Sequence, residues 1–176
     1  DLHNGRRRQR QMCIRDRFQG VRYRQRLTRV VTRVSRTGDG PLYVVIGVAV
    51  WLAEIPRAEA FCLALILAFA IERPFYFLLK IGLKRNRPEQ VMPSIKAAVV
   101  PADQFSFPSG HTSAAFCFAT IAGMLLTGPH NPFFLWASAI GLSRIMLAVH
   151  FPCDVMAGAI IGSTIATISA GLVSAL

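Results

Sequence analysis

The segment from Val155 to Leu176 runs for 22 residues without a charged side chain. A bilayer-spanning helix needs about 20 predominantly apolar residues, and lipid offers no water to pair with the backbone of any other open structure. The whole chain is 53% hydrophobic and only 16% charged, which is too apolar for an ordinary soluble protein. The segment therefore predicts a membrane-spanning helix.

Four further apolar stretches precede this segment. The first is short and needs its flanking residues to approach bilayer length, whereas the second is long and contains Pro74, where we expect a kink. The expected crossings are residues 41–57, 58–83, 112–127, 131–150 and 153–174. The sequence therefore predicts an all-α, polytopic membrane helix bundle with about five transmembrane helices.

Positive charge is concentrated near the N-terminus. The net charge is +11, and twelve of the 20 Lys and Arg residues precede residue 38. Residues 21–36 place apolar and arginine side chains on separate stripes, which predicts a basic amphipathic helix on an anionic membrane surface. A solvated tail is the alternative interpretation. We divide the chain into a basic N-terminal arm, residues 1–37, and a membrane domain, residues 38–176.

The arm gives no evidence of a nucleic-acid partner. Residues 12–17 resemble translated sequencing-adapter sequence, so we assign no function to residues 1–17. The arm has no recognisable reader motif and is followed by lipid-facing segments, so we expect no binding to nucleic acid. The chain has four cysteines and no CxxC pair, which argues against a zinc or redox site.

Ionisable residues beside apolar helices are costly unless they are used, and the first cluster of them surrounds Lys80. Arg87 follows seven residues later, almost two helical turns, and Pro88 forces it out of helical geometry. Arg73 lies seven residues before Lys80 on the same stripe, next to Glu72, which can neutralise a neighbouring cation. The alternative interpretation of this cluster is a positive flank whose side chains extend to the membrane surface.

The second cluster is the Pro-Ser-Gly-His run that ends at His111, directly before an uncharged helix. Ser109 or Gly110 can act as the N-cap, which leaves backbone N–H groups free to bind a phosphate. A simple N-cap explains these two residues equally well, but it does not explain the histidine in the first turn.

The third cluster joins Ser143 and Arg144 to His150 and Asp154. Pro152 is suited to the first position of a new helix, which places Asp154 in its first turn. A carboxylate beside one imidazole nitrogen fixes the tautomer and makes the other nitrogen a better nucleophile or base. We therefore expect Asp154 to orient His150.

Five crossings would bring all three clusters to the same membrane face. Phosphoryl transfer requires cations and N–H dipoles that bind the phosphoryl oxygens. It also requires a nucleophile in line with the breaking bond and an acid that protonates the leaving oxygen. The basic arm would lie on this face too, so the positive-inside rule favours a cytoplasmic site.

The clusters resemble the three signature motifs of the type 2 phosphatidic acid phosphatase superfamily, which also includes glucose-6-phosphatase and the vanadium haloperoxidases. K-x6-R-P occupies residues 80–88, P-S-G-H occupies residues 108–111, and S-R-x5-H-x3-D occupies residues 143–154. The resemblance covers roughly residues 38–176 and identifies this region as a membrane phosphatase domain.

The resemblance implies a role for each motif residue. His150 would attack phosphorus, Asp154 would hold its ring, and His111 would protonate the leaving alkoxide. The phosphoryl oxygens would be bound by Lys80, Arg87, Ser109, Gly110 and Arg144. The resemblance implies no metal and no other cofactor.

The implied substrate is a lipid phosphate: phosphatidic acid, phosphatidylglycerol phosphate, or a polyprenyl phosphate or diphosphate. A sugar phosphate is the alternative. We expect an integral protein of a bacterial inner membrane. The active sites of the bacterial lipid phosphatases that it resembles usually face outward, whereas the positive-inside rule favours a cytoplasmic site here. Two other functions compete: a vanadate-dependent haloperoxidase, marked by bound vanadium and halide oxidation, and a non-catalytic protein that binds anionic membrane lipids without hydrolysing them.

Overall fold

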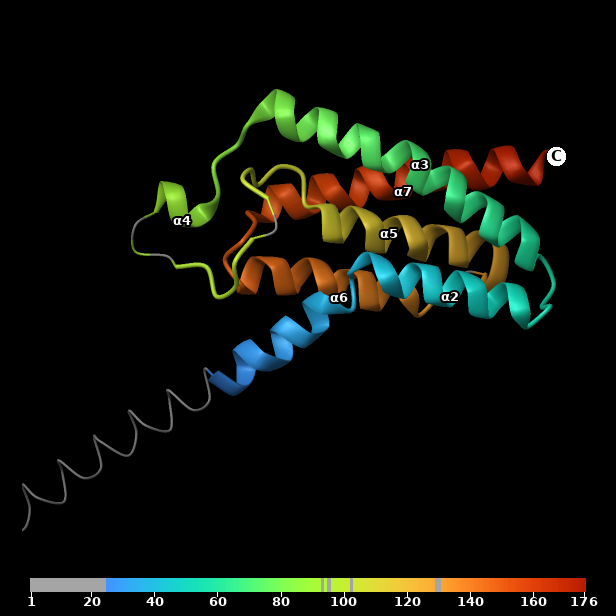
Figure 1. Ribbon diagram of the computed structural model, residues 1–176, viewed down its shortest axis with the longest axis horizontal. Helices are drawn as coiled ribbons and strands as arrows, with labels where there is room; N and C mark the ends of the chain where they lie inside the picture. Colours follow the sequence, from blue (N-terminus) through green and yellow to red (C-terminus); the bar gives the residue numbers. More distant parts are fainter. Residues whose placement is uncertain (1–24, 93, 95, 102, 129–130) are drawn as a thin grey trace, which may run out of the picture.

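The computed structural model describes residues 25–92, 94, 96–101, 103–128 and 131–176. All regular structure in these ranges is helical, which confirms the all-α prediction (Figure 1). Residues 25–36 form a helix, and the elements that follow are α2 (Gly40–Leu52), α3 (Ala58–Leu83), α4 (Pro88–Val91), α5 (Gly110–Ala122), the π-helical η1 (Gly123–Thr127), α6 (Phe133–Met146) and α7 (Pro152–Ser174).

Among the described residues three helical segments are long and apolar enough to cross a bilayer: Ala58–Val91, which begins with α3; Gly110–Thr127, which is α5 with its continuation η1; and α7. The apolar helices α2 and α6 have 13 and 14 residues, so each is about 20 Å long against a hydrocarbon core of about 30 Å. The count of five crossings stays a prediction. The helix α3 continues through Pro74, and the kink also stays a prediction.

The helix α5 lies at the centre and contacts α3, α6 and α7. Its contact with α7 is close because glycines of α7 face it. A Cβ on Gly162 would lie 2.1 Å from the Ser113 carbonyl oxygen, and one on Gly158 would lie 2.6 Å from the Ser109 carbonyl oxygen. Only a residue without a side chain lets the two backbones approach this closely.

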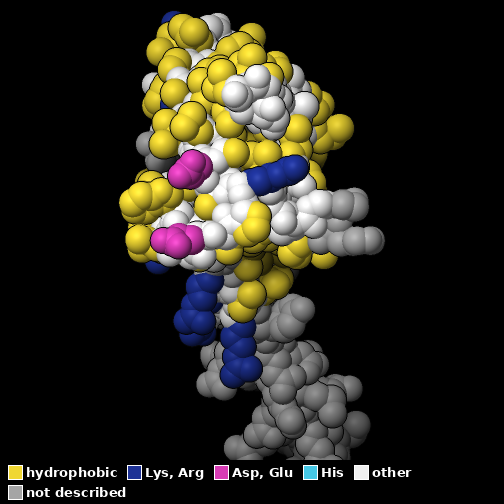
Figure 2. Space-filling model, turned by 90° about the vertical axis from the view of Figure 1, so that its right-hand side faces the viewer, with side chains coloured by type: hydrophobic (Ala, Val, Ile, Leu, Met, Phe, Trp, Pro, Cys, Tyr) yellow, Lys and Arg dark blue, Asp and Glu magenta, His cyan; other side chains and the backbone are white. Residues whose placement is uncertain are grey.

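Phe118 of α5 organises the apolar core. Its ring packs edge-to-face on the rings of Phe61, Phe133 and Trp136, at centroid separations of 5.9, 5.2 and 5.8 Å. Such pairs add about 0.5–1.5 kcal/mol each beyond the area they bury. Large apolar side chains also cover the outside of the bundle. Figure 2 shows the end where α2 joins α3, with acidic and basic side chains among the hydrophobic ones. An apolar outer surface is what contact with lipid requires.

The helix at residues 25–36 packs against the bundle through Val31, which is buried with Leu147 and Val149. Leu27 and Val30, on the predicted apolar stripe, are exposed. Residues 1–24, including the start of the predicted amphipathic helix, lie outside the described part of the chain. The surface position of this helix and the boundary at residue 37 stay predictions.

We expect Gly162→Ala to destabilise the protein strongly, because its methyl group would meet the backbone of α5. Overpacking against flexible side chains costs about 1–3 kcal/mol, and a backbone cannot move aside as they do. Gly171→Ala on the same helix is the matched control, since nothing lies within 4 Å of its added Cβ. Thermal unfolding in detergent compares the two. Equal midpoints would show that the α5–α7 contact is not as tight as described.

Candidate active site

All three sequence clusters lie at one end of the bundle, where α3 and α6 end and α5 and α7 begin (Figure 1). Three local predictions are confirmed there. Arg87 has extended backbone geometry directly before α4, Ser109 is the N-cap of α5, and α7 begins at Pro152.

Lys80 and Arg87 are both buried, and one carboxylate joins them. The Lys80 ammonium lies 2.6 Å from Oδ2 of Asp103, and the Arg87 guanidinium donates to Oδ1 of the same residue. The Tyr76 hydroxyl donates a third hydrogen bond to Asp103, at 2.6 Å. Arg87 also donates to the carbonyl of Val149, at 2.5 Å, which ties this pair to the residue before His150.

Sequence reasoning missed Asp103, which lies in the loop before α5 with no motif around it. Burial favours the neutral form of its carboxyl group, but the hydrogen bonds from Lys80 and Tyr76 and the charges of Lys80 and Arg87 outweigh burial. They hold the pKa of Asp103 below its usual 3.8. The carboxylate is therefore ionised at neutral pH, and it lies between the two cations.

His150 is buried in the loop between α6 and α7. Its Nδ1 lies 2.6 Å from the carbonyl oxygen of Ser106. A carbonyl oxygen only accepts, so Nδ1 carries the proton and Nε2 keeps its lone pair. Ser106 is itself fixed, since its hydroxyl donates to the carbonyl of Asn86 at 3.0 Å. The geometry thus selects the tautomer that a nucleophile at Nε2 needs.

Asp154, the expected partner of His150, contacts it less directly. Its Oδ2 lies 3.8 Å from Nδ1 of His150, which is beyond hydrogen-bonding distance. The same oxygen accepts from the backbone N–H of Phe151 at 2.8 Å, and Oδ1 accepts from Arg85 at 2.8 Å. Asp154 therefore caps α7 and pairs with Arg85, and it acts on His150 through its charge. Its orienting role stays a prediction.

Burial and the nearby cations both lower the pKa of His150. Burial lowers the pKa most, Asp154 opposes that shift, and the nearby cations Lys80, Arg87 and Arg144 lower the pKa further. The result is a pKa below the usual 6.5. The imidazole is therefore neutral at neutral pH, as attack on phosphorus requires.

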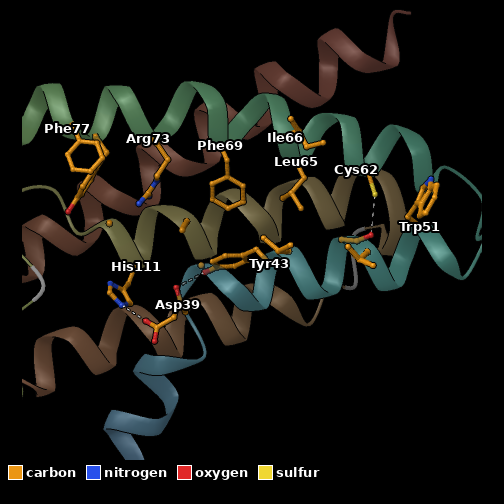
Figure 3. Close-up of a pocket in the computed structure, with 18 of the residues that line it drawn as sticks. Asp39, Tyr43, Trp51, Cys62, Leu65, Ile66, Phe69, Arg73, Phe77 and His111 are labelled. Atoms are coloured by element: carbon orange, nitrogen blue, oxygen red, sulfur yellow. Dashed lines mark hydrogen bonds and ion pairs between the residues drawn. The ribbon is translucent and has the colours of Figure 1, made fainter.

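His111 lies in the first turn of α5, and its Nε2 is 2.9 Å from Oδ1 of Asp39. Asp39 precedes α2, so the start of α2 reaches the site, as Figure 3 shows. This contact holds the imidazole of His111 at the end of the bundle where the motif residues lie. Sequence reasoning missed Asp39 because it placed this residue in the turn after the basic arm.

Ser109 and Gly110 are more constrained than a free phosphate cradle would be. The backbone N–H of Ser109 donates to the carbonyl of Asp154 at 3.1 Å. A Cβ on Gly110 would lie 2.8 Å from the ring of Tyr76, so this glycine permits the approach of an aromatic ring. The N–H groups left for a phosphate are those of the residues that follow Ser109 in the first turn of α5.

Arg144 of α6 is buried, and its Nη1 donates to the hydroxyl of Ser35 at 2.8 Å. Among the described residues none accepts from its Nε. A buried guanidinium with a free donor is suited to an anion. Ser35 lies on the helix at residues 25–36, and its contact with Arg144 was not predictable because that helix was assigned to the arm.

A cavity of about 1010 Å³ opens beside this site between α2 and α3. Figure 3 shows His111 and Asp39 near one end of it and Trp51 near the other. Apolar side chains line most of its length, including Val44, Leu65 and Phe69. The charged side chains that line it, together with one histidine, are Arg73, Asp39, Asp103 and His111. A long apolar space of this kind can hold the hydrocarbon chain of a lipid.

The family model described as PAP2 superfamily matches residues 58–175. The chain belongs to the PAP2 superfamily. It is 31% identical over 135 residues to the Arabidopsis thaliana protein named "Probable lipid phosphate phosphatase beta", covering 61% of this chain and 63% of that relative. It is 30% identical over 152 residues to phosphatidylglycerophosphatase B of Bacillus subtilis, covering 77% of this chain and 70% of that relative.

A solved structure confirms the fold of this PAP2 protein. The transmembrane PAP2 type phosphatidylglycerolphosphate phosphatase of Bacillus subtilis superposes with a TM-score of 0.68 at 28% identity, covering 85% of this chain and 78% of that one. With its three long apolar helices, this PAP2 protein is an integral membrane protein. The chain spans less than two thirds of the Arabidopsis relative's length.

We expect Asp103→Asn to destabilise the protein, by about 3 kcal/mol, because it leaves two buried cations without their carboxylate. Inorganic phosphate should then raise the unfolding midpoint of the variant more than that of the unaltered protein, since no internal anion competes. Glu89→Gln, an exposed carboxylate of α4, is the control. An equal effect of phosphate on the variant and the unaltered protein would contradict this account of Asp103.

Proposed function

We propose that this PAP2 protein hydrolyses a phosphate monoester or diphosphate of a membrane lipid through a phosphohistidine at His150, without a metal ion. The observation that carries the proposal is the state of His150. It is buried and neutral, its Nδ1–H is fixed on the carbonyl of Ser106, and cations surround it. Those cations supply the positive charge that a metal ion supplies in other phosphatases.

In the first step the Nε2 lone pair of His150 attacks phosphorus and forms an N–P bond. The bond between phosphorus and the leaving oxygen breaks, and His111 donates its proton to that oxygen. Such acid catalysis contributes about 10²–10⁴-fold. Lys80, Arg87 and Arg144 stabilise the negative charge on the remaining phosphoryl oxygens, together with N–H groups at the start of α5.

In the second step water attacks the phosphorus of the phosphohistidine. His111, now neutral, accepts a proton from that water, and the N–P bond breaks to release inorganic phosphate. His150 returns to its neutral form with Nδ1–H still directed at Ser106. Asp39 supports both roles of His111 because its charge stabilises the protonated ring without being consumed.

A lipid is the substrate class that the cavity supports best. The cavity is an apolar space between two apolar helices, and its lining includes His111 and Asp103 of the site, so a headgroup and a hydrocarbon chain can be bound together. The named relatives act on lipid phosphates, according to their names. We also propose that the protein lies in a bacterial inner membrane, and the relative from Bacillus subtilis supports a bacterial source.

Phosphate release from phosphatidic acid and from undecaprenyl diphosphate, measured in detergent with EDTA, tests this function. We expect release by the unaltered protein and a loss of at least about 10³-fold in His150→Ala, since the nucleophile is removed. Thr167→Ala, an exposed hydroxyl bonded only within α7, is the control. Lipid binding without release would favour the non-catalytic alternative, and halide oxidation with vanadate would favour the haloperoxidase.

The pH dependence follows from the state of His150. Its pKa lies below 6.5, so activity should be retained at pH 6.5 and lost only as the pH falls further and Nε2 becomes protonated. The acidic limb of kcat/KM, measured from pH 4.5 to 8, should therefore have its midpoint below 6.5. A midpoint above 6.5 would contradict the proposed state of the nucleophile.

A further inference from the structure

Arg73 is a cation of the cavity that the catalytic steps above do not use. It lies on α3, seven residues before Lys80, and 41% of its side chain is exposed. In Figure 3 it extends from α3 toward the end of the cavity where His111 and Asp39 lie. A cation among apolar transmembrane helices is costly, and such residues mark binding or transport sites by default.

The known contacts of Arg73 leave most of its guanidinium free. Its Nε donates to Oε2 of the buried Glu72. Among the described residues no acceptor pairs with either Nη, and one of them, Nη2, is buried. Because Nε is paired and Nη2 is shielded from solvent, Nη1 is the nitrogen of this guanidinium from which a phosphate in the cavity can accept a charge-assisted hydrogen bond.

The aromatic ring of Tyr76 links Arg73 to the proposed catalytic site. The Arg73 guanidinium carbon lies 5.0 Å from the ring centroid, and the Lys80 ammonium lies 4.4 Å from the same centroid. Both cations therefore lie against the same aromatic ring, which places the two positive charges close to each other. Lys80 lies in the last turn of α3 and contacts Asp103, whereas Arg73 lies about two turns earlier on α3 and lines the cavity.

We propose that Arg73 binds a second phosphate group of the substrate, located between the phosphate that is hydrolysed and the hydrocarbon chain. The proposal rests on the proposed function, because it takes Lys80 as a ligand of the hydrolysed phosphate. It names the substrate class as a lipid with two phosphates. The second phosphate is either a phosphodiester one glycerol away or the inner phosphate of a diphosphate.

The competing explanation is that Arg73 only neutralises Glu72. That pair accounts for Nε but not for the two Nη groups, and it does not explain why the guanidinium lines the cavity. The two explanations differ in one measurable respect. A counterion of Glu72 affects every substrate alike, whereas a ligand of the second phosphate affects only substrates that carry one.

The experiment compares two matched substrate pairs in detergent: phosphatidylglycerol phosphate with phosphatidic acid, and undecaprenyl diphosphate with undecaprenyl phosphate. For each pair we divide kcat/KM for the substrate with two phosphates by kcat/KM for the substrate with one phosphate. We expect Arg73→Gln to lower this ratio by roughly ten-fold or more in at least one pair, as loss of a charge-assisted hydrogen bond predicts. Arg73→Lys, which keeps the charge but not the fork, should lower it less.

The substrate pair whose ratio falls identifies how the two phosphates are linked. The link is glycerol in phosphatidylglycerol phosphate and a shared oxygen in undecaprenyl diphosphate. If Arg73→Gln does not fold, because Glu72 loses its partner, the double variant E72Q/R73Q removes both charges and should show the same fall. Arg57→Gln, at the opposite end of α3, is the control and should leave both ratios unchanged. Unchanged ratios in the Arg73 variants would overturn the proposal. No hydrolysis of any substrate by the unaltered protein would instead refute the proposed function.

Discussion

The close packing of α5 against α7 is the contact on which the site depends. Gly158 and Gly162 let the two backbones meet, and the N–H of Ser109 then donates to the carbonyl of Asp154 at 3.1 Å. This one contact brings the second and third motifs together, although most of α5, η1 and most of α6 separate them along the chain. A side chain at either glycine would move His111 away from His150, because both lie beside the helix starts that the glycines hold together.

Four cations at this end of the bundle have partners within the protein. Asp103 joins Lys80 to Arg87, Ser35 contacts Arg144, and Glu72 contacts Arg73. Buried charges in apolar surroundings require such partners. A phosphate that enters the site therefore exchanges one set of ionic contacts for another, and the free energy of binding is the difference between the two. This exchange gives the loop before α5 and the helix at residues 25–36 a direct influence on binding.

The helical class, the three longest apolar helices and the grouping of the motif residues at one end of the bundle could be predicted from the sequence. The helices follow from hydropathy over many residues. The grouping of the motif residues follows from their positions at the ends of those helices. The partners of the motif residues were not predictable. Asp103, Asp39 and Ser35 lie in a loop, a turn and the N-terminal helix, and only tertiary folding places them beside the motif residues. The carbonyl of Ser106 could not be predicted either, because a backbone group leaves no trace in the residue types.

The central claim is that His150 becomes phosphorylated, and trapping the intermediate tests it most directly. A substrate labelled with ³²P in the phosphate that is hydrolysed would be mixed with the protein in EDTA, quenched in alkaline detergent within the first turnover, and digested for peptide mapping. The account predicts a base-stable, acid-labile label on the peptide that contains His150. Label on another residue, or complete hydrolysis in a single turnover with no labelled protein at any time, would contradict it.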